Sequence, residues 1–387
     1  MTITKGIFMR KFFSERMRGV EKTLIRRITD LADSSCIDLG LGELRFPTPK
    51  SILGHIKEKS GDWNLGYTPN EGLQELRSLV AEKCGYSVSP DQVCITVGAE
   101  EAIFATLMVL VNPGDEVLVP DPGYPAYPLI VKMAGGVPKT YPLHPENHFD
   151  LKCEDIERRI SEKTKAIIIN SPNNPSGAIY SREEMMSLAR LLKERKAMAI
   201  SDEVYRDIYF EEEPDSIARH VKNFVVINSL SKSFSMTGWR LGWCIAPPAL
   251  IKLIATFHQL AVACAPAISQ RAAIFALKGN AEEERLQNRE ELRKRRELAI
   301  SCLEKHTDLS YIKPAGAFYI FTNIANKIAK YGSSLDISMN LLSKEKVVTI
   351  PGIAFGQRGE GFLRISFSPP PEQIEEAIRR IGHFFKG

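Results

Sequence analysis

Short apolar segments alternate with segments of helical periodicity through the middle of this chain, and this alternation constrains the fold more than any other feature. The apolar segments, rich in Val and Ile, span residues 93–97, 116–119, 165–170, 198–201, 224–228 and 240–245. Strands that are apolar along their whole length are buried on both faces, and strands that alternate with helices usually pair in parallel. We therefore expect an α/β fold in which a large, mostly parallel sheet is covered by helices on both faces.

The two ends of the chain follow another pattern. Apolar residues recur at helical spacing over 14–32, and beyond residue 248 a long helical region is followed by clustered short strands and helices. With 387 residues the chain is long enough for two domains. We expect a large cofactor-binding domain at 46–275 and a smaller α+β domain built from 1–45 and 276–387.

Composition and charge exclude several classes of protein. The net charge is only +4 and the basic residues are dispersed, whereas nucleic-acid binding requires clustered Lys and Arg on one face. No stretch approaches the ~20 apolar residues of a membrane helix. Seven cysteines, an odd number without a C-x-x-C pair, favour free thiols in a reducing compartment, and the seven histidines lack metal-ligand spacing. We expect a cytoplasmic protein with no metal site and with neither nucleic acid nor membrane as a partner.

Polar residues follow five of the expected strands, at the points where the strands end. Open α/β sheets bind their ligands in front of such strand ends. In chain order the residues are Gly98, Ala99 and Glu100, then Tyr124, then Asn174, then Asp202 and Tyr205, and finally Ser229 and Lys232. Any one of these groups could serve only as a turn, a helix cap or a packing residue. Five in succession are improbable as a coincidence, so we interpret them as one functional site.

The residue types in this set indicate a particular chemistry. Lys232, among positive neighbours or in an enclosed site, would keep part of its amine neutral, as a covalent bond to a carbonyl requires. A helix that opens after Gly98 can bind an anion through its free N–H groups, and Arg240 can clamp a phosphate through its fork of donors. Tyr124 can stack on an aromatic ring, and Asp202 can pair with a protonated ring nitrogen. Together these residues fit a phosphorylated aromatic aldehyde.

Four motifs of the chain resemble those of class I/II aminotransferases in the fold-type I superfamily of pyridoxal-phosphate enzymes. They are Asn173-Asn-Pro-Ser-Gly177, Ser201-Asp-Glu-Val-Tyr205, the run from Ser229-Leu-Ser-Lys232 to Arg240-Leu-Gly242, and Phe362-Leu-Arg-Ile-Ser366. Their order and spacing agree with the family over nearly the whole chain. The resemblance implies an enzyme similar to aspartate aminotransferase, which moves an amino group between an L-amino acid and a 2-oxo acid through a lysine aldimine and a pyridoxamine intermediate.

The resemblance also implies a role for each residue around the cofactor, pyridoxal 5′-phosphate. Lys232 would form the internal aldimine and shuttle the proton, Asp202 would pair with the ring nitrogen, and Tyr124 would stack on the ring. Tyr205 and Asn174 would hydrogen-bond the ring oxygen. The residues assigned to the phosphate are Gly98, Ala99, Glu100, Ser229, Ser231 and Arg240.

Substrate and partner roles follow from the same resemblance. Arg364 resembles the arginine that binds the α-carboxylate of the substrate, with Asn174 and the N–H of Gly42 assisting it. In this family the residue at Tyr67 reaches the phosphate of the neighbouring subunit. The resemblance thus implies a homodimer with shared active sites.

Two residues depart from the pattern of the family. Relatives usually have Gly-Glu-Pro-x-Phe near the N-terminus, whereas this chain has Gly42-Glu-Leu-Arg45-Phe. Arg45 therefore either alters the preference for the substrate side chain or faces solvent. Glu100 stands where many relatives have a small or basic residue, and its charge would disfavour acidic substrates.

Other functions use the same residues. A β-C–S lyase, a cyclising synthase or an oxidase on this scaffold would carry the same motifs, so the motifs do not separate them from an aminotransferase. Ser229-x-x-Lys232 also matches the S-x-x-K of serine acyl-enzymes, but the chain lacks their Lys-Thr-Gly partner. A cofactor-binding regulator would carry a basic DNA-binding module ahead of the scaffold, for which we find no room. The amino donor, the 2-oxo acceptor and the pathway do not follow from the sequence.

Overall fold

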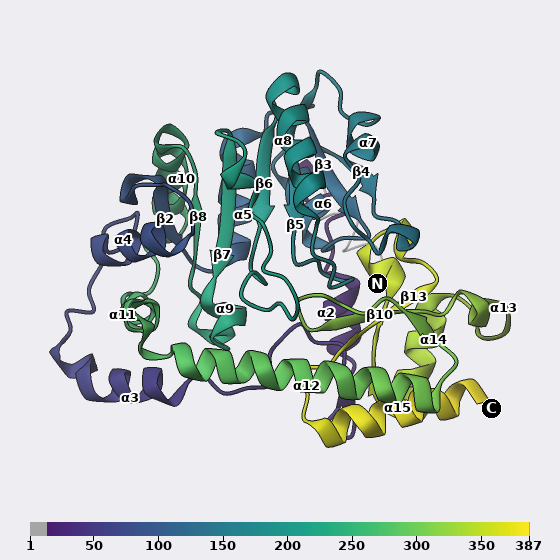
Figure 1. Cartoon of the computed structure of the whole chain (residues 1–387). Coiled ribbons are helices and arrows are strands. Elements are labelled where there is room, and N and C mark those ends of the chain that lie inside the picture. The colour runs from purple at the N-terminus through teal and green to yellow at the C-terminus, as the bar shows by residue number, and fades with distance from the viewer. Residues whose placement is uncertain (1–13, 387) are drawn as a thin grey trace, which may run out of the picture.

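A seven-stranded sheet forms the centre of the molecule in this computed structural model, which describes residues 14–386 (Figure 1). The order of the strands is β2-β8-β7-β6-β5-β3-β4. Their bounds are β2 Val93–Thr96, β3 Glu116–Asp121, β4 Val137–Pro142, β5 Thr164–Asn170, β6 Met198–Asp202, β7 Phe224–Ser229 and β8 Gly242–Ile245. All neighbours pair in parallel except β8, which runs antiparallel to β2 and β7. The expectation of a large, mostly parallel sheet is confirmed.

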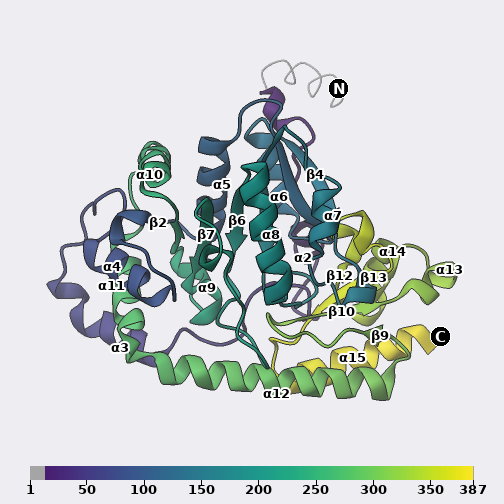
Figure 2. The same ribbon diagram turned by 45° about the horizontal axis from the view of Figure 1, so that its top comes forward.

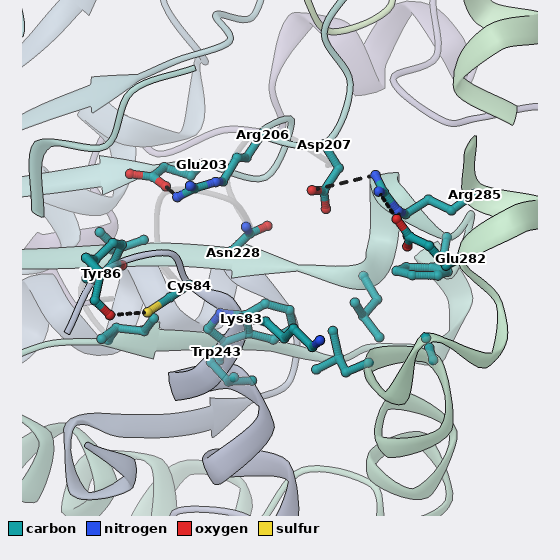
Figure 3. Close-up of a pocket in the computed structure, with 18 residues that line it drawn as sticks. Lys83, Cys84, Tyr86, Glu203, Arg206, Asp207, Asn228, Trp243, Glu282 and Arg285 are labelled. Carbon is teal, nitrogen blue, oxygen red and sulfur yellow. Dashed lines mark hydrogen bonds and ion pairs between the residues drawn. The ribbon is translucent and has the colours of Figure 1, made fainter. Parts of the chain in front are cut away.

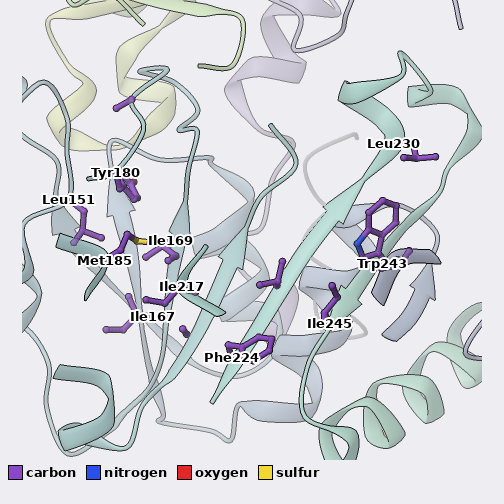
Figure 4. Close-up of a cluster of buried hydrophobic side chains, with 14 of the residues drawn as sticks. Leu151, Ile167, Ile169, Tyr180, Met185, Ile217, Phe224, Leu230, Trp243 and Ile245 are labelled. Carbon is purple, nitrogen blue, oxygen red and sulfur yellow. The ribbon is translucent and has the colours of Figure 1, made fainter. Parts of the chain in front are cut away.

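Helices cover both faces of this sheet (Figures 1 and 2). One face carries α5 (Ala99–Leu110), α6 (Ala126–Met133) and α10 (Pro248–Val262), and the other carries α4 (Gln74–Lys83), α8 (Arg182–Arg195) and α11 (Ala267–Phe275). Side chains alternate along each strand, so Val225 and Ile227 of β7 enter the first core and Val226 enters the second. Ile169 of β5 and Met185 of α8 lie together in the second core (Figure 4).

Shorter helices complete the large unit around the sheet. Helix α3 (Lys50–Lys59) packs against α11, and α7 (Cys153–Glu157) packs against α8. Helix α9 (Leu230–Ser233) follows β7 without an intervening loop. The residue that ends β7 and the lysine on α9 are therefore held by a buried strand.

A four-stranded antiparallel sheet lies beside the large unit. Its order is β12 (Ile350–Pro351), β13 (Phe362–Ser366), β10 (Tyr319–Asn323) and β9 (Ser310–Tyr311). The long helix α12 (Glu282–His306) packs along α15 (Pro371–Lys386), and both bury apolar residues in the core of this sheet. Helices α13 (Ile328–Tyr331) and α14 (Ser334–Asn340) flank it.

Residues from the N-terminal and the C-terminal segments that the structure describes pair in this second unit. Strand β1 (Ile37–Asp38) pairs in parallel with β11 (Val347–Val348). An α+β unit from the N- and C-terminal segments was expected on the pattern of the sequence, and these pairings agree with it. The boundaries at 45/46 and 275/276 stay a prediction.

The N-terminal helix is shorter than the periodicity predicts. Instead of one helix over 14–32, the structure has a 3-10 turn at Glu15–Met17 and α2 at Leu24–Thr29. The side chain of Thr23 accepts a hydrogen bond from the backbone N–H of Arg26 and so begins α2 at Leu24. The cap, and not the apolar spacing, decides where this helix starts.

Candidate active site

A cavity of about 490 Å³ lies between the ends of the central strands and the second sheet. Most of the residues predicted for the site line it, namely Gly42, Ala99, Glu100, Tyr124, Asn174, Asp202, Tyr205, Ser229, Ser231, Lys232, Arg240 and Arg364. Gly98 does not line the cavity itself, but it caps α5 directly before the lining residues Ala99 and Glu100. Tyr67 does not line the cavity, and 93% of its surface is exposed. The tertiary structure thus gathers residues from five strand ends and from β13.

Lys232 is held at the base of the cavity by the short helix α9. Ser229 caps this helix, since its hydroxyl accepts a hydrogen bond from the backbone N–H of Ser231. The amine Nζ of Lys232 donates to the carbonyl oxygen of Gly42 over 2.6 Å. Burial lowers the pKa of Lys232 to about 8, while the carboxylate of Glu43 opposes this shift. The amine is therefore neutral in part of the molecules near neutral pH.

Asp202 ends β6 and presents its carboxylate to the same cavity. Its Oδ2 accepts a hydrogen bond of 2.7 Å from the hydroxyl of Tyr127, and its Oδ1 accepts one from the backbone N–H of Val204. Burial raises the pKa of Asp202 to about 6. Within residues 14–386 no cation lies within ion-pair distance of this carboxylate. Asp202 is thus a buried acid with no positively charged partner among the described residues.

An anion cradle lies where α5 begins. Gly98 has φ +86°, and a Cβ there would lie 2.6 Å from Nη2 of Arg240. A Cβ on Gly242 would lie 2.7 Å from the backbone nitrogen of Ala99, so both glycines keep this space open. Arg240 donates to the carbonyl oxygens of Thr237 and Val97. The free N–H groups of α5 and this guanidinium suit a phosphate.

Arg364 extends from β13 into the far side of the cavity and is only 1% exposed. Its Nη1 donates to Oδ1 of Asn174 over 2.8 Å, and its Nη2 donates to the carbonyl oxygen of Gly40. The guanidinium lies 4.2 Å from the ring centre of Tyr319 and 4.9 Å from that of Phe355. Its Nε is buried and has no hydrogen-bond partner in the described part of the chain. A buried cation of this kind requires an anion.

Hydrogen bonds connect the arginine to the aspartate across the cavity. The backbone N–H of Asn174 donates to Oδ1 of Asn170 over 2.8 Å, and Nδ2 of Asn170 donates to the carbonyl oxygen of Asp202 over 2.9 Å. Beside them the hydroxyls of Tyr205 and Tyr319 lie 2.9 Å apart. The positions of the two charged groups are therefore fixed relative to one another.

Sequence reasoning missed several residues of this site. Tyr127 lies three residues after the predicted Tyr124, a spacing at which helical side chains share a face, and this spacing could have revealed it. Asn170 ends β5, whereas the sequence analysis selected Asn174 in the loop that follows. Tyr319 comes from a distant strand, and no local pattern marks it. Arg45, which departs from the family pattern, pairs with Asp38 over 2.8 Å and does not line the cavity.

A second cavity, of about 360 Å³, is lined by residues that follow β6, among them Glu203, Arg206 and Asp207 (Figure 3). Its charged side chains are paired: Glu203 with Arg206 at 3.1 Å, Arg285 with both Asp207 and Glu282, and Lys83 with Glu82 outside the lining. In the first cavity, by contrast, Lys232, Asp202, Arg240 and Arg364 form no ion pair within residues 14–386. Charged groups without an ion-pair partner therefore distinguish the first cavity from the second.

The described residues offer no alternative site based on a metal. Between residues 14 and 386, no group of three His, Cys, Asp or Glu side chains is placed to hold an ion. All seven cysteines are free thiols. No helix in the same range combines the length and the apolar character that crossing a membrane requires.

Comparison with known families decides which group of proteins this cavity belongs to. The family model described as aminotransferase class I and II matches residues 34–381. The chain belongs to this family. The predicted enzyme class, an aminotransferase of the pyridoxal-phosphate-dependent fold-type I group, is thereby confirmed.

Named relatives of this aminotransferase match nearly its whole length. The putative aminotransferase YugH of Bacillus subtilis is 36% identical, covering 97% of this chain and 99% of the relative. The probable aspartate/prephenate aminotransferase of Aquifex aeolicus is also 36% identical, covering 96% and 98%. The solved structure of aspartate aminotransferase from Thermus thermophilus with maleate superposes with a TM-score of 0.90 at 30% identity, covering 96% and 99%. The fold of this aminotransferase is therefore that of its relatives.

Proposed function

We propose that this aminotransferase binds pyridoxal 5′-phosphate in the first cavity and moves an amino group between an L-amino acid and a 2-oxo acid. The observation that carries the proposal is that four charged groups around one space, Lys232, Asp202, Arg240 and Arg364, form no ion pair within residues 14–386. Each has a counterpart in the cofactor or the substrate. Lys232 matches the aldehyde, Asp202 the ring nitrogen, Arg240 the phosphate and Arg364 the α-carboxylate.

The remaining residues of the cavity fit the same assignment. The N–H groups that begin α5 after Gly98 would hold the phosphate with Arg240, Ser229 and Ser231, in a cradle that a side chain on Gly98 would fill. Tyr124 would lie against the ring, and the hydroxyl of Tyr205 would donate to the ring oxygen. Asp202, with its raised pKa, would regain its charge beside a protonated ring nitrogen.

The chemistry of the cofactor divides the work among these residues. Pyridoxal phosphate supplies an aldehyde that takes up the amino group and a ring that withdraws electrons from the α-carbon. Lys232 is placed to carry the α-proton, because a pKa of about 8 allows its amine to accept and release a proton near neutral pH. Arg364 and Asn174 would bind the α-carboxylate and orient the α-carbon toward that amine. Asp202 would hold the proton on the ring nitrogen.

We further propose a homodimer in which Tyr67 of each chain completes the cavity of the other. Tyr67 is 93% exposed, and Leu260 is 82% exposed. Asn70 donates to the carbonyl oxygen of Ala263, which brings the segment of Tyr67 beside the end of α10. An aromatic and an apolar side chain this exposed suit a surface that a partner covers.

The test of the proposed function follows the two half-reactions separately. The purified chain loaded with pyridoxal phosphate is mixed with single amino acids, and its absorbance is expected to change to that of the pyridoxamine form and to return when a 2-oxo acid is added. Lys232→Ala should remove the visible absorbance of the bound cofactor. Conversion with no donor at all, or release of ammonia instead of amino transfer, would contradict an aminotransferase.

The dimer has a test of its own. Sedimentation of the loaded chain should give twice the mass of one chain, and Tyr67→Phe should weaken retention of the cofactor without changing that mass. A monomer with full activity would contradict the shared site.

A further inference from the structure

The first cavity is lined by more carboxylates than the proposed cofactor and the α-amino acid group would engage. Asp202, Lys232, Arg240 and Arg364 each have a counterpart in the proposed function. Two carboxylates that line the cavity, those of Glu43 and Glu100, have none. Their surroundings differ.

The carboxylate of Glu43 interacts with the charge of Lys232. The same carboxylate accepts a hydrogen bond from the hydroxyl of Thr237, which lies between Lys232 and Arg240 in the chain. Among the charged neighbours of Lys232, Glu43 does most to hold the pKa of the amine up against the effect of burial. This carboxylate is therefore already engaged with the base of the cavity.

The carboxylate of Glu100, in contrast, has no interaction partner in the described part of the chain. Glu100 is the second residue of α5, its side chain is exposed, and it lines the cavity. Across residues 14–386 no hydrogen bond or ion pair reaches its carboxylate. Its charge raises the pKa values of both Asp202 and Tyr124, which line the same cavity.

Cations that could receive a second carboxylate are already paired. Arg26 of α2 also lines the cavity, but its Nε lies 2.8 Å from Oδ1 of Asp30. Arg45 pairs with Asp38 and lies outside the cavity lining. A substrate side chain that extends past the α-carbon therefore meets one carboxylate without a partner and no cation without one in the described part of the chain.

We propose that Glu100 selects amino acids whose side chains end in a cation, such as an amine or a guanidinium, and that it disfavours dicarboxylates as donors and as acceptors. The inference rests on the proposed function of the cavity. Both half-reactions use the same space, so the 2-oxo acid that accepts the amino group should also lack a second carboxylate. A charged hydrogen bond in a partly enclosed site changes affinity by about tenfold to a hundredfold.

The test measures equilibrium binding to the loaded enzyme, without turnover. Amino acids with a methyl group in place of the α-hydrogen cannot lose that proton, so their binding can be followed by calorimetry. The three probes are 2-methylornithine, 2-methylaspartate and 2-methylleucine. We expect 2-methylornithine to bind about tenfold to a hundredfold more tightly than 2-methylaspartate. Glu100→Gln should remove this ratio, and Glu100→Lys should reverse it.

Glu183→Lys is the matched control. Glu183 is the second residue of α8, as Glu100 is of α5, and it is exposed and outside the cavity. The substitution makes the same change of charge at the same helix position, so it should leave the ratio of affinities unchanged. All measurements are made with saturating cofactor, because Glu100→Lys is also expected to bind phosphate more tightly.

The outcomes separate this inference from the proposed function. If 2-methylaspartate binds more tightly than 2-methylornithine, or if Glu100→Lys leaves the ratio unchanged while amino acids still react, the inference about Glu100 is wrong and the aminotransferase stands. A preference for dicarboxylates that Arg26→Gln abolishes would assign selection to Arg26 instead. An enzyme that binds none of the three probes contradicts the proposed function itself, and the inference with it.

Discussion

Tyr127 donates a hydrogen bond of 2.7 Å from its buried hydroxyl to Oδ2 of Asp202. Tyr127 lies on α6 and Asp202 ends β6, so a helix on one face of the sheet orients a carboxylate at the end of a strand. The bond favours the charged carboxylate and lowers its pKa, whereas burial raises it. Tyr127 therefore acts on the cofactor through Asp202, and we regard it as a positioning residue.

Tyr127→Phe should weaken the affinity for pyridoxal phosphate by about tenfold, since a hydrogen bond to a charged group contributes more than one between neutral groups. Without the hydroxyl the pKa of Asp202 rises further, and the carboxylate holds a ring proton less firmly. Titration of the apo chain with cofactor measures the change. Tyr141→Phe is the control, because that buried hydroxyl donates to the carbonyl oxygen of Ile168, away from the cavity. Equal losses of affinity in both variants would contradict the role of Tyr127.

Capture of pyridoxal phosphate by the apo chain should accelerate with pH and reach half of its maximal rate near pH 8. The neutral amine is the form that attacks an aldehyde. Burial lowers the pKa of Lys232 from 10.5 to about 8, so the neutral form becomes dominant above that pH. Stopped-flow absorbance follows the reaction, with the solvent-exposed side-chain amine of Nα-acetyllysine as the reference. A common midpoint near pH 10 for both would show that burial does not act on this amine.

Asp202→Asn should stabilise the apo chain above pH 6 by on the order of 3 kcal/mol. The pKa of Asp202 is raised from 3.8 to about 6, so its contribution to stability is complete below pH 3.8 and is lost as the pH rises through 6. The difference between variant and wild type should therefore grow from pH 4 to pH 7. Urea unfolding at each pH measures it. In the loaded enzyme the order should reverse, because only the carboxylate pairs with a ring cation; a difference that does not depend on pH would contradict this account.

Gly98→Ala should lower cofactor affinity by about tenfold, because its Cβ would reach within 2.6 Å of Nη2 of Arg240 in the anion cradle. Gly114→Ala is the control, since Gly114 has a similar φ of +90° but no atom within 4 Å of the added Cβ. Both substitutions should cost about 1 kcal/mol or more of stability from backbone strain. Only Gly98→Ala should change the binding of phosphate-containing ligands. Full affinity in that variant would place the phosphate elsewhere.

Arg364→Lys should raise KM for every amino acid by about tenfold to a hundredfold, because an ammonium cannot replace the planar fork of donors. Affinity for the cofactor should change little. Arg296→Lys is the control: Arg296 is 2% exposed, pairs with Glu211 and Glu297, and does not line the cavity. It should lower the melting temperature and leave KM unaltered. A rise in KM confined to one class of side chain would show that Arg364 does not bind the α-carboxylate.

Much of the fold could be predicted because its signals are local. The strand from 224 to 228 is apolar along its length, and the helices around it repeat their apolar residues at helical spacing. The antiparallel direction of β8 could not be predicted, because a strand that reads as apolar fits a sheet in either direction. The short α2 was also missed, since the Thr23 cap outweighs the spacing of apolar residues over 14–32.

The sequence by itself determined the class of the fold, the segment that carries Lys232 and the order of the polar strand ends, since each depends on residues close together in the chain. Only the tertiary structure decided which side chains meet. Arg364 reaches Asn174 across 190 positions, and Tyr127 reaches Asp202 across 75. Such contacts depend on the order of strands in the sheet, which no local pattern encodes. For the same reason Glu100 could be recognised as a carboxylate without a partner only once every neighbouring charge had been placed.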